Sequence, residues 1–380
     1  MKIDRILLFP YYISLKLRDK YYKKRADKLF TPGVPSVCVG NVTAGGTGKT
    51  PMVELILKML RESPEWQGRH IAMLSRGYKR ESKGFQQVLA DGSASMFGDE
   101  PLQIKKKFPE VTVAVDKNRV EGCRLLCEPS RLSAKRYAKC WDKNFQPAEY
   151  IVLDDAFQYR RLKAALNVVL VDWNRPVFRD SLLPIGRLRD LSERVGDADI
   201  IIVTKCPSDI DDNARASFAA SLGVENYDAE ACRGSVAVSG REVTLLFSRI
   251  CYSQIVGVYP ETEPRYVYAK KAILVSGIAK DTPLRNYLSD FYKICKRFRF
   301  PDHHKYSWKD VNSIKAALRK SPTAAIITTE KDVQRLLDFN GMPPEIRERL
   351  LVAPIEAKFL SERERNIFYD KIVSLKAIRS

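Results

Sequence analysis

A glycine-rich loop between an apolar segment and a helical segment constrains this chain most. The sequence VCVGNVTAGGTGKTPMV occupies residues 37–53, and its glycine-rich part ends in Lys49 and Thr50. Glycines allow a tight turn and a close approach of the backbone, so that successive N–H groups face phosphate oxygens. The N-terminus of the following helix adds the positive end of its dipole. This pattern predicts a strand–loop–helix unit that binds a nucleoside triphosphate.

The residues of this loop have separate expected tasks. Lys49 is expected to reach the outer phosphates, and the Thr50 hydroxyl is expected to bind Mg²⁺. The loop departs from the standard spacing, because Thr43 stands at the first glycine position and Ala44 stands where transport and metal-insertion ATPases carry lysine. An ordinary glycine-rich turn is the alternative, which the flanking strand and helix disfavour. The predicted ATP-binding residues are Thr43, Ala44, Gly45, Gly46, Thr47, Gly48, Lys49 and Thr50.

Apolar segments alternate with helical segments through the first part of the chain. Buried strands that alternate with helices indicate an α/β fold of the P-loop NTPase type, with a mostly parallel sheet covered by helices on both faces. Ligands bind at the carboxyl ends of such strands. The predicted strands lie within residues 35–42, 70–77, 111–116, 150–157, 166–173 and 198–205, and the predicted helices within 50–62, 100–107, 117–127 and 209–222.

The pattern changes near residue 230, which indicates more than one domain. A chain of 380 residues suggests two or three domains of roughly 100–200 residues each. Residues 31–231 are expected to form the nucleotide-binding core, and the alternating segment 232–271 is expected to form a β-ribbon. Residues 272–358 carry further strand–loop–helix patterns and predict a smaller α/β domain, which the ribbon joins to the core. Residues 359–380 are expected to close the chain with an amphipathic helix.

Residues 1–30 combine apolar and aromatic side chains with many lysines and arginines. The apolar part is too short and too interrupted to cross a bilayer, which takes about 20 predominantly apolar residues. It fits a helix that lies in the membrane interface, with aromatic rings at headgroup depth and basic residues on the polar side. The alternative is a helix packed on the protein's own core. A helix with one edge packed on the core and one edge exposed to the membrane would agree with both interpretations.

Net charge and cysteine content limit the binding partners and the cellular compartment that suit this chain. The formal net charge of +19 requires an acidic partner, such as an anionic membrane or a phosphorylated substrate. Nucleic acid is disfavoured as a partner, because no recognition-helix, zinc-finger or aromatic-platform pattern is found. The eight cysteines are scattered without metal-ligand spacing, so reduced thiols and no structural zinc are expected. The start of the chain shows no secretory signal-peptide pattern.

A second chemical signal is the segment YIVLDDAFQ at residues 150–158. In P-loop enzymes a hydrophobic strand that ends in an acid accompanies the phosphate-binding loop, and its carboxylate holds Mg²⁺ directly or through water. Asp154 and Asp155 are therefore candidate Mg²⁺ ligands, and the sequence leaves open which of them binds the metal. The alternative is that these residues cap the next helix.

Seven motifs in order extend these signals over nearly the whole chain. They lie between residues 36 and 332 and read VGNVTAGGTGKTP, SRGYKR, GDEP, LDDAFQ, LLPIGRLRDL, PDHH and TTEKD. In this order they resemble the tetraacyldisaccharide 4′-kinase family of lipid A synthesis. The resemblance implies transfer of the γ-phosphoryl group of ATP, with Mg²⁺, to the 4′-hydroxyl of a tetraacylated disaccharide 1-phosphate, giving lipid IV-A. It also implies an acylated disaccharide phosphate lipid and an anionic membrane surface as partners, and a peripheral location on the cytoplasmic face of the bacterial inner membrane.

The implied reaction benefits from a group that accepts the proton of the sugar hydroxyl. The resemblance favours His303 as the partner of Asp99, with Asp99 accepting the proton and the imidazole orienting it. Glu100 is expected to assist Mg²⁺ together with Thr50, and His304 is expected to contact the substrate. Acids that merely favour a helix N-terminus and structural histidines are the alternatives. The full set of candidates is Asp99 and Glu100 in FGDEP, and Asp302, His303 and His304 in FPDHHKY.

Four arginines, Arg76, Arg119, Arg187 and Arg189, are candidates for binding phosphate, since a planar guanidinium binds it in a bidentate manner. Arg76 follows the second predicted strand and is expected at the ligand-facing edge. Arg187 and Arg189 alternate with apolar residues in PIGRLRDL. One of the two is expected to neutralise charge on the transferring group, and the other to hold the substrate's phosphate. Ordinary surface charge is the alternative for each. The predicted catalytic residues are Asp99, His303, Lys49 and Arg76.

Two other classes of function are compatible with a phosphate-binding loop. One is a P-loop ATPase or GTPase that acts as a metal or protein chaperone. The absence of a lysine at position 44 and of a clear guanine-recognition motif counts against it. The other is a membrane-bound adaptor whose nucleotide only controls association. Transfer of labelled phosphate to the lipid distinguishes a kinase from both.

Overall fold

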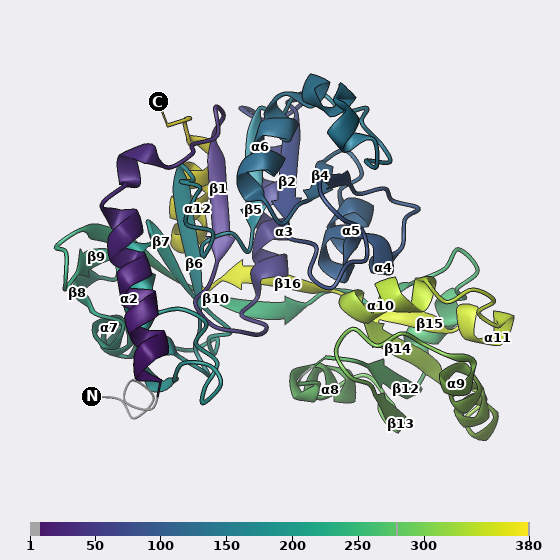
Figure 1. The fold of residues 1–380 in the computed structure, drawn as a ribbon. Helices are drawn as coiled ribbons and strands as arrows, with labels where there is room; N and C mark the ends of the chain where they lie inside the picture. The colour runs from purple at the N-terminus through teal and green to yellow at the C-terminus, as the bar shows by residue number, and fades with distance from the viewer. Residues whose placement is uncertain (1–7, 279, 379–380) are drawn as a thin grey trace.

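The large domain is built on a mostly parallel sheet that runs through its centre (Figure 1). The computed structural model describes residues 8–278 and 280–378. Within them, the sheet has the order β3-β4-β2-β5-β1-β6-β7-β10-β9-β8, and β16 pairs with β10. The strands are β1 (Ser36–Gly40), β2 (Ile71–Ser75), β3 (Gln86–Gln87), β4 (Thr112–Val115), β5 (Tyr150–Asp154), β6 (Leu166–Asp172), β7 (Ile200–Thr204), β8 (Val224–Asp228), β9 (Arg233–Val236), β10 (Glu242–Tyr252) and β16 (Ile355–Phe359).

Helices cover both faces of this sheet and bury its central strands. Every residue of β1, β2, β5 and β7 is buried, because an apolar cluster lies on each face. Burial on both faces explains why these strands read as continuous apolar runs. In sheet order, the strands β4-β2-β5-β1-β6-β7-β10 are mutually parallel. The expected α/β fold is confirmed. The helices are α3 (Lys49–Glu62), α4 (Ala94–Phe97), α5 (Asp99–Lys107), α6 (Arg119–Cys127), α7 (Asp212–Ser221) and α12 (Glu362–Val373).

A smaller domain contains a separate five-stranded sheet in the order β11-β15-β14-β12-β13. Alternate residues of β12 and β14 point to opposite faces, and an apolar cluster forms on each face. The smaller domain therefore has a core of its own. Its strands are β11 (Val256–Gly257), β12 (Lys271–Ser276), β13 (Lys293–Arg299), β14 (Ala325–Thr329) and β15 (Leu350–Ala353), and its helices are α8 (Thr282–Ser289), α9 (Trp308–Lys320), α10 (Glu330–Leu337) and α11 (Pro344–Arg347).

Two antiparallel strand segments connect the domains (Figure 1). The second half of β10 pairs with β16, from Ser248 opposite Phe359 to Tyr252 opposite Ile355. The first half of β10 lies in the large sheet beside β7. The segment expected as a separate ribbon at 232–271 is thus divided among the large sheet, this link and the smaller sheet, to which β11 belongs. The last strand of the smaller sheet is β15, and β16 follows it in the link instead of ending that domain at residue 358. Pairing between segments far apart in sequence is the reason for both differences.

The chain returns to the large domain at its C-terminal end. Helix α12 begins with a capping box between Ser361 and Glu364. The indole N–H of Trp66 donates to the carbonyl of Val373 at 2.8 Å, and the hydroxyl of Tyr150 donates to the carbonyl of Ile372 at 3.1 Å. These contacts attach the closing helix to the large domain.

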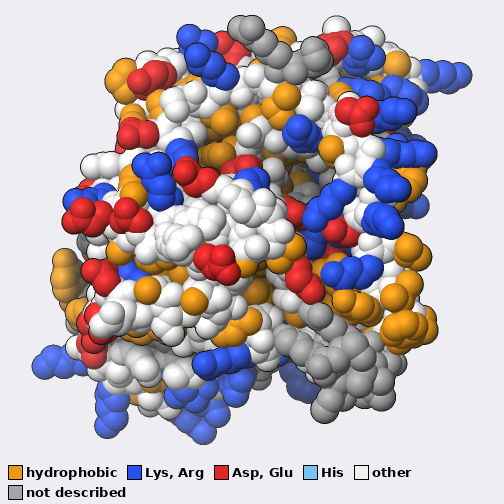
Figure 2. All heavy atoms as spheres, turned by 90° about the vertical axis from the view of Figure 1, so that its left-hand side faces the viewer, with side chains coloured by type: hydrophobic (Ala, Val, Ile, Leu, Met, Phe, Trp, Pro, Cys, Tyr) orange, Lys and Arg blue, Asp and Glu red, His pale blue; other side chains and the backbone are white. Residues whose placement is uncertain are grey.

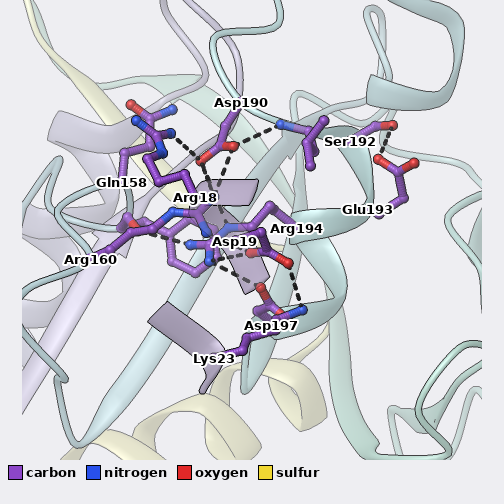
Figure 3. A network of polar contacts seen from close by, with 12 residues as sticks. Arg18, Asp19, Lys23, Gln158, Arg160, Asp190, Ser192, Glu193, Arg194 and Asp197 are labelled. Atoms are coloured by element: carbon purple, nitrogen blue, oxygen red, sulfur yellow. Dashed lines mark hydrogen bonds and ion pairs between the residues drawn. The ribbon is translucent and has the colours of Figure 1, made fainter. Parts of the chain in front are cut away.

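Helix α2 (Phe9–Lys23) is held on the large domain by a buried network of charges (Figure 3). Arg160 donates to Asp19 of α2 at 2.6 Å and to the two carboxylate oxygens of Asp190 at 3.1 and 3.2 Å. Arg194 also approaches Asp19, at 3.5 Å. The carboxylate of Asp190 is fully buried, and Arg18 and Arg194 also approach it, at 3.5 and 3.8 Å, so that three arginines offset its charge. The network fixes α2 in one position on the core.

The opposite edge of α2 is exposed. Leu15 is buried, whereas Phe9 and Leu17 are 56% and 62% exposed. Figure 2 shows lysines and arginines among hydrophobic side chains on this side of the molecule. The helix therefore has one packed and one exposed edge, and residues 1–7 of the expected segment lie outside the described residues. In the part of the chain that the structure describes, no helix combines the length and the apolar character needed to cross a membrane.

Candidate active site

The glycine-rich loop lies between β1 and α3, as the sequence predicts. Gly45 and Gly48 have φ angles of 108° and 86°, a left-handed backbone that residues with a Cβ rarely adopt. The side-chain amide of Asn41 donates to the hydroxyl of Thr47 at 2.7 Å and to that of Thr43 at 3.3 Å. The loop conformation thus depends on the glycines and on Asn41 together.

Neighbouring segments at the carboxyl edge of the sheet hold the loop from outside. The backbone N–H of Ala44 donates to the carbonyl of Arg187 at 2.7 Å. The hydroxyl of Thr204, at the end of β7, donates to the carbonyl of Thr47 at 2.9 Å. The ammonium group of Lys205, after β7, donates to the carbonyl of Gly46 in the loop and, at 2.6 Å, to Asp172 at the end of β6. The loop is therefore positioned by several strand ends, which sequence places far apart.

Lys49, the first residue of α3, faces an acidic partner. Its Nζ lies 3.7 Å from Oδ1 of Asp155, and Arg189 binds both oxygens of the same carboxylate. Burial alone would raise the pKa of Asp155, but Lys49 and Arg189 lower it to about 2. Asp155 therefore remains ionised and holds two cations beside the phosphate-binding loop.

Asp154, at the end of β5, has a different environment. Its carboxylate is buried and accepts a hydrogen bond from the hydroxyl of Ser75 at 2.8 Å. Burial, and then the negative charges of Asp155 and Glu100, raise the pKa of Asp154 to about 6. A divalent cation would offset this repulsion between carboxylates. The oxygen ligands present therefore fit Mg²⁺.

A metal ion at this place needs ligands from outside the protein. Among residues 8–278 and 280–378, no group of three or more His, Cys, Asp or Glu side chains is arranged to hold a metal. Thr50 is half-buried in the first turn of α3, and Glu100 is engaged by Lys331 at 3.1 Å. Mg²⁺ is commonly held by one or two carboxylates together with phosphate oxygens and water. The site thus fits a Mg²⁺–nucleotide complex better than a bare ion.

A second polar centre forms where the two domains meet. Asp99 begins α5 in the large domain and is only 1% exposed. Its Oδ2 lies 2.5 Å from Nδ1 of His303, and its Oδ1 accepts a hydrogen bond from Nε of Arg335. Both partners come from the smaller domain. His303 has a φ of 65°, which is uncommon for a residue with a Cβ and occurs more often at functional sites.

The two polar centres are neighbours. Glu100 follows Asp99 directly, and its charge contributes to the raised pKa of Asp154. The charge of Lys49 acts on the same carboxyl and lowers its pKa. A Cβ on Gly98, which precedes Asp99, would lie 3.4 Å from the Cα of Gly77, just after β2, so the Asp99–His303 pair lies at the same carboxyl edge of the sheet as the nucleotide loop.

Further contacts between the domains come from α10 and from the residue that follows it. Lys331 binds Glu100. Asp338, directly after α10, accepts hydrogen bonds from the backbone N–H groups of Ala94 and Ser95 at 3.1 and 3.3 Å. These bonds cap the start of α4 from the opposite domain. Helix α10 is therefore a principal docking element of the smaller domain.

His304 differs from the expectation. Its Nε2 lies 3.0 Å from Oδ2 of Asp310, and its ring stacks on Phe300. Adjacent side chains point in different directions here, so His303 reaches Asp99 while His304 supports the start of α9. These contacts support a structural role for His304, and its expected contact with the substrate stays a prediction.

The predicted arginines occupy different environments. Arg189 is engaged with Asp155 inside the nucleotide site, so it is not placed to hold a separate substrate phosphate. Arg187 is exposed, and its Nη1 lies 3.4 Å from the point that a Cβ on Gly45 would occupy. Arg76 is exposed directly after β2. The latter two side chains can therefore meet ligand phosphates.

Sequence reasoning missed Lys331 and Arg335. Both belong to TTEKDVQRL, in which the motif TTEKD contains Lys331 without giving it a role, and Arg335 lies beyond the motif. Residues four positions apart lie on one face of a helix, so this spacing was an available signal once a helix was predicted there. Arg119, a phosphate-binding candidate from the sequence, is instead buried and donates to the carbonyl of Asp154 at 3.3 Å, where it supports the end of β5.

A buried carboxyl on α3 makes stability depend on pH. Glu54 accepts a hydrogen bond from Gln103 at 2.8 Å and pairs at 2.6 Å with Lys107, which also reaches Glu330 of the smaller domain at 3.1 Å. Burial, and then the charge of Glu330, raise the pKa of Glu54 from 4.5 to about 7. Between pH 4.5 and about 7, the folded protein keeps a proton on Glu54 that the unfolded chain has lost. The carboxyl group of Glu54 therefore lowers the free energy of unfolding as the pH rises through this range.

Replacing Glu54 by Gln should stabilise the protein more at high pH than at low pH. The amide keeps the shape but has no charge to desolvate, so the gain should reach up to about 3 kcal/mol near pH 8 and be smaller near pH 5. Urea unfolding at the two pH values measures the difference. Glu62→Gln, at the exposed end of the same helix, is the matched control. Equal gains at both pH values would contradict the raised pKa.

Comparison with known proteins covers the whole chain. The family model described as tetraacyldisaccharide-1-P 4′-kinase (LpxK) matches residues 5–373. A tetraacyldisaccharide 4′-kinase of Parabacteroides distasonis is 36% identical, over 98% of this chain and 95% of that relative. The protein of the same name from Porphyromonas gingivalis is 33% identical, over 96% of this chain and 94% of that relative.

A solved structure shares the fold. It is that of LpxK from Aquifex aeolicus in complex with ATP, with a TM-score of 0.67 and 23% identity, and the match covers 97% of this chain and 99% of that one. The likeness extends over both domains and the link between them. Because the family model matches nearly the whole chain and these relatives are 33–36% identical over at least 94% of their own length, the chain belongs to the tetraacyldisaccharide 4′-kinase family.

Proposed function

We propose that this chain transfers the γ-phosphoryl group of ATP to the 4′-hydroxyl of tetraacyldisaccharide 1-phosphate, giving the lipid IV-A precursor of lipid A. The relatives are named tetraacyldisaccharide 4′-kinases, and the solved neighbour is an ATP complex. The observation that carries the proposal is the buried Asp99–His303 pair beside the nucleotide loop. A nucleotide-controlled chaperone or adaptor needs no such pair. A kinase gains from a proton acceptor for the attacking hydroxyl.

The cations of the loop neutralise the phosphates. Phosphoryl transfer depends mainly on positioning and on compensation of charge. Lys49 would exchange its contact with Asp155 for the outer phosphates of ATP. Arg189, on the other side of the same carboxylate, would neutralise charge on the transferring group. Both side chains are therefore held near their places of action by one acid.

Mg²⁺ would be held by Asp154 and by the Thr50 hydroxyl, with Glu100 nearby. When bound, the ion supplies charge neutralisation to the phosphate oxygens. Asp154 is suited to this role because its carboxylate is buried beside other acids, and Ser75 fixes one of its oxygens. Asp155 is less suited, because Lys49 and Arg189 already balance its charge.

The Asp99–His303 pair accepts the proton of the 4′-hydroxyl as a unit. Oδ2 of Asp99 and Nδ1 of His303 share one hydrogen bond, so the proton taken up belongs to the pair. In this structure His303 and Arg335 cover both oxygens of Asp99. Because Asp99 is only 1% exposed, entry of the sugar hydroxyl requires the smaller domain to move away. When that domain returns, the hydroxyl can use the second lone pair of a carboxylate oxygen, and water that would otherwise hydrolyse ATP is excluded.

The two exposed arginines bind the remaining phosphates. Arg187 lies over the loop at Gly45 and would hold the substrate's existing phosphate. Arg76, at the carboxyl end of β2, would bind a phosphate of the nucleotide. Guanidinium groups suit both tasks, because they bind phosphate oxygens in a bidentate manner.

Incubation with the disaccharide lipid and γ-labelled ATP tests the proposed function. The expected result is label in the lipid, with one ADP formed for each phosphate transferred. A metal or protein chaperone, or a nucleotide-controlled adaptor, would bind or hydrolyse ATP and leave the lipid unlabelled. Unlabelled lipid in the presence of bound ATP would overturn the assignment as a kinase.

Peripheral attachment to the cytoplasmic face of the bacterial inner membrane is part of the same proposal. The substrate carries acyl chains and therefore resides in a membrane. The exposed edge of α2 offers apolar side chains next to Lys16, Lys20 and Lys23. Each basic residue near an anionic surface contributes about 1 kcal/mol. An anionic membrane surface is thus the expected partner of α2.

Replacing Phe9 and Leu17 together by Ser should weaken binding to anionic vesicles. It should also raise the apparent KM for the lipid more than that for ATP, while the fold is kept because both side chains are exposed. Sedimentation with vesicles measures binding, and added salt should weaken it further. Val238→Ser, at a position that is 92% exposed, is the control. Unchanged sedimentation would place the membrane contact elsewhere in the chain.

A further inference from the structure

Arg335 makes a contact that the proposed mechanism does not use. Its side chain is 6% exposed, and its Nε donates to Oδ1 of Asp99. His303 engages the other oxygen of that carboxylate. A guanidinium buried to this degree needs an acidic partner to offset its lost hydration. The acid in contact with it is the proposed proton acceptor.

We infer that Arg335 is a positioning residue for phosphoryl transfer, which holds the carboxylate of Asp99 in the plane that the hydroxyl and His303 require. This inference rests on the proposed function. A carboxylate held through one oxygen still turns about its Cβ–Cγ bond. Contacts on both oxygens, from partners on different segments, fix the plane. Such preorganisation lowers the cost of reaching the reactive geometry.

Helix α10 orients two adjacent acids at once. Arg335 engages Asp99, and Lys331 engages Glu100 at 3.1 Å. The two cations are four residues apart and therefore project from one face of the helix. The start of α5 thus lies against a rigid element that carries two matching charges. The proposed proton acceptor and the acid beside the metal site are aligned together.

The start of α10 is itself fixed within the smaller domain. The carboxylate of Asp332 accepts hydrogen bonds from the Thr329 hydroxyl at 2.7 Å and from the backbone N–H of Gly277 at 2.9 Å. A Cβ on Gly277 would lie 2.7 Å from Oδ1 of Asp332 and 3.0 Å from the carbonyl oxygen of Pro301, so a larger residue would displace this contact. The position of Arg335 on α10 is therefore fixed by contacts within the smaller domain. Asp99 receives its second contact only when the domains dock.

Ordinary docking is the competing explanation, and the chain offers a matched control for it. Asp338, three residues after Arg335, also contacts the large domain, where it caps the start of α4 through Ala94 and Ser95. These contacts do not involve Asp99. Asp338→Asn therefore weakens docking from the same helix and leaves the carboxylate of Asp99 held.

The test compares Arg335→Ala, Arg335→Lys and Asp338→Asn in the full chain, with ATP and the disaccharide lipid. Arg335→Ala should lower kcat about 10- to 100-fold, because misplaced reacting groups cost rate. KM for either substrate should change less than about threefold, since Arg335 is not proposed to touch them. Arg335→Lys should recover only part of kcat, because a point charge lacks the planar guanidinium. Methylguanidinium added to Arg335→Ala should raise kcat, and Asp338→Asn should keep it within about twofold.

Histidine-selective NMR gives a readout that does not depend on turnover. The chain has three histidines, so the ring signals of His303 are readily separated from those of His70 and His304. Arg335→Ala should shift the His303 signals, because its partner carboxylate loses a fixed orientation. The signals of His70, which contacts Thr112 in the large domain, should stay in place.

Three outcomes would overturn the inference. One is an equal loss of kcat in Arg335→Ala and Asp338→Asn, which would assign Arg335 to docking alone. Another is a rise in the KM for both substrates in Arg335→Ala without a fall in kcat. The third is an unshifted His303 signal in Arg335→Ala or Arg335→Lys. If the wild-type chain leaves the lipid unlabelled, the proposed function fails, and the NMR result still decides whether Arg335 orients Asp99.

Discussion

Replacing Asp99 or His303 by Ala should each lower kcat by about 10²- to 10⁴-fold, the range that a positioned general base contributes. Each change breaks the pair through which the hydroxyl proton is accepted. Nucleotide affinity should change little, because Lys49 and Thr50 lie in the large domain and still hold the phosphates. Steady-state transfer of labelled phosphate gives kcat, and fluorescence with a nucleotide analogue gives the affinity.

The double variant tests whether the two side chains act together. If they form one unit, Asp99→Ala with His303→Ala should be little worse than the worse single change. His304→Ala removes the neighbouring imidazole, which contacts Asp310 and Phe300, and should keep most of the activity. Fully additive losses would show that the two groups act independently and would return His303 to a structural role.

Lys49→Ala should reduce turnover by about 10²- to 10³-fold, as expected for the loss of a group that stabilises charge in the transition state. The ammonium group lies 3.7 Å from Asp155, and phosphate oxygens would take the place of that carboxylate. Removal of the charge therefore leaves the outer phosphates uncompensated. Arg189 continues to pair with Asp155, so no buried acid is left alone and the fold should persist.

Lys58→Ala is the matched control for Lys49→Ala. Lys58 belongs to the same helix but is exposed, so its removal should leave both kcat and the unfolding midpoint close to those of the wild-type chain. Wild-type turnover in a folded Lys49→Ala protein would contradict the assignment of this loop to ATP.

The nucleotide half of the site could be predicted from the sequence because its parts are local. The loop residues are contiguous, and their glycines and the following helix define the conformation by turn chemistry alone. Asp154 could be placed near them, because the carboxyl ends of parallel strands share one edge of the sheet. The strand order that puts β5 next to β1 bears this out.

The catalytic half was accessible only in part. Residue types and spacing left Asp99, Glu100, Asp302, His303 and His304 as equal candidates, and the resemblance to a family selected the pair Asp99 and His303. The structure brings these two together and directs His304 away to Asp310. Neighbours in sequence have different partners here because the left-handed backbone at His303 turns the two side chains apart.

The sequence by itself determined what short-range physics encodes: the buried strands, the helices between them, the phosphate-binding loop and the acids at the strand ends. Only the tertiary structure decided which surfaces meet. It placed Arg335 on Asp99, paired β16 with β10, and fixed α2 through Arg160 and Asp190. Hydrophobic periodicity records which face of an element is buried, but not against which partner. Buried charges show this limit of prediction from sequence most clearly, because each charge is tolerated only beside a partner that a distant segment supplies.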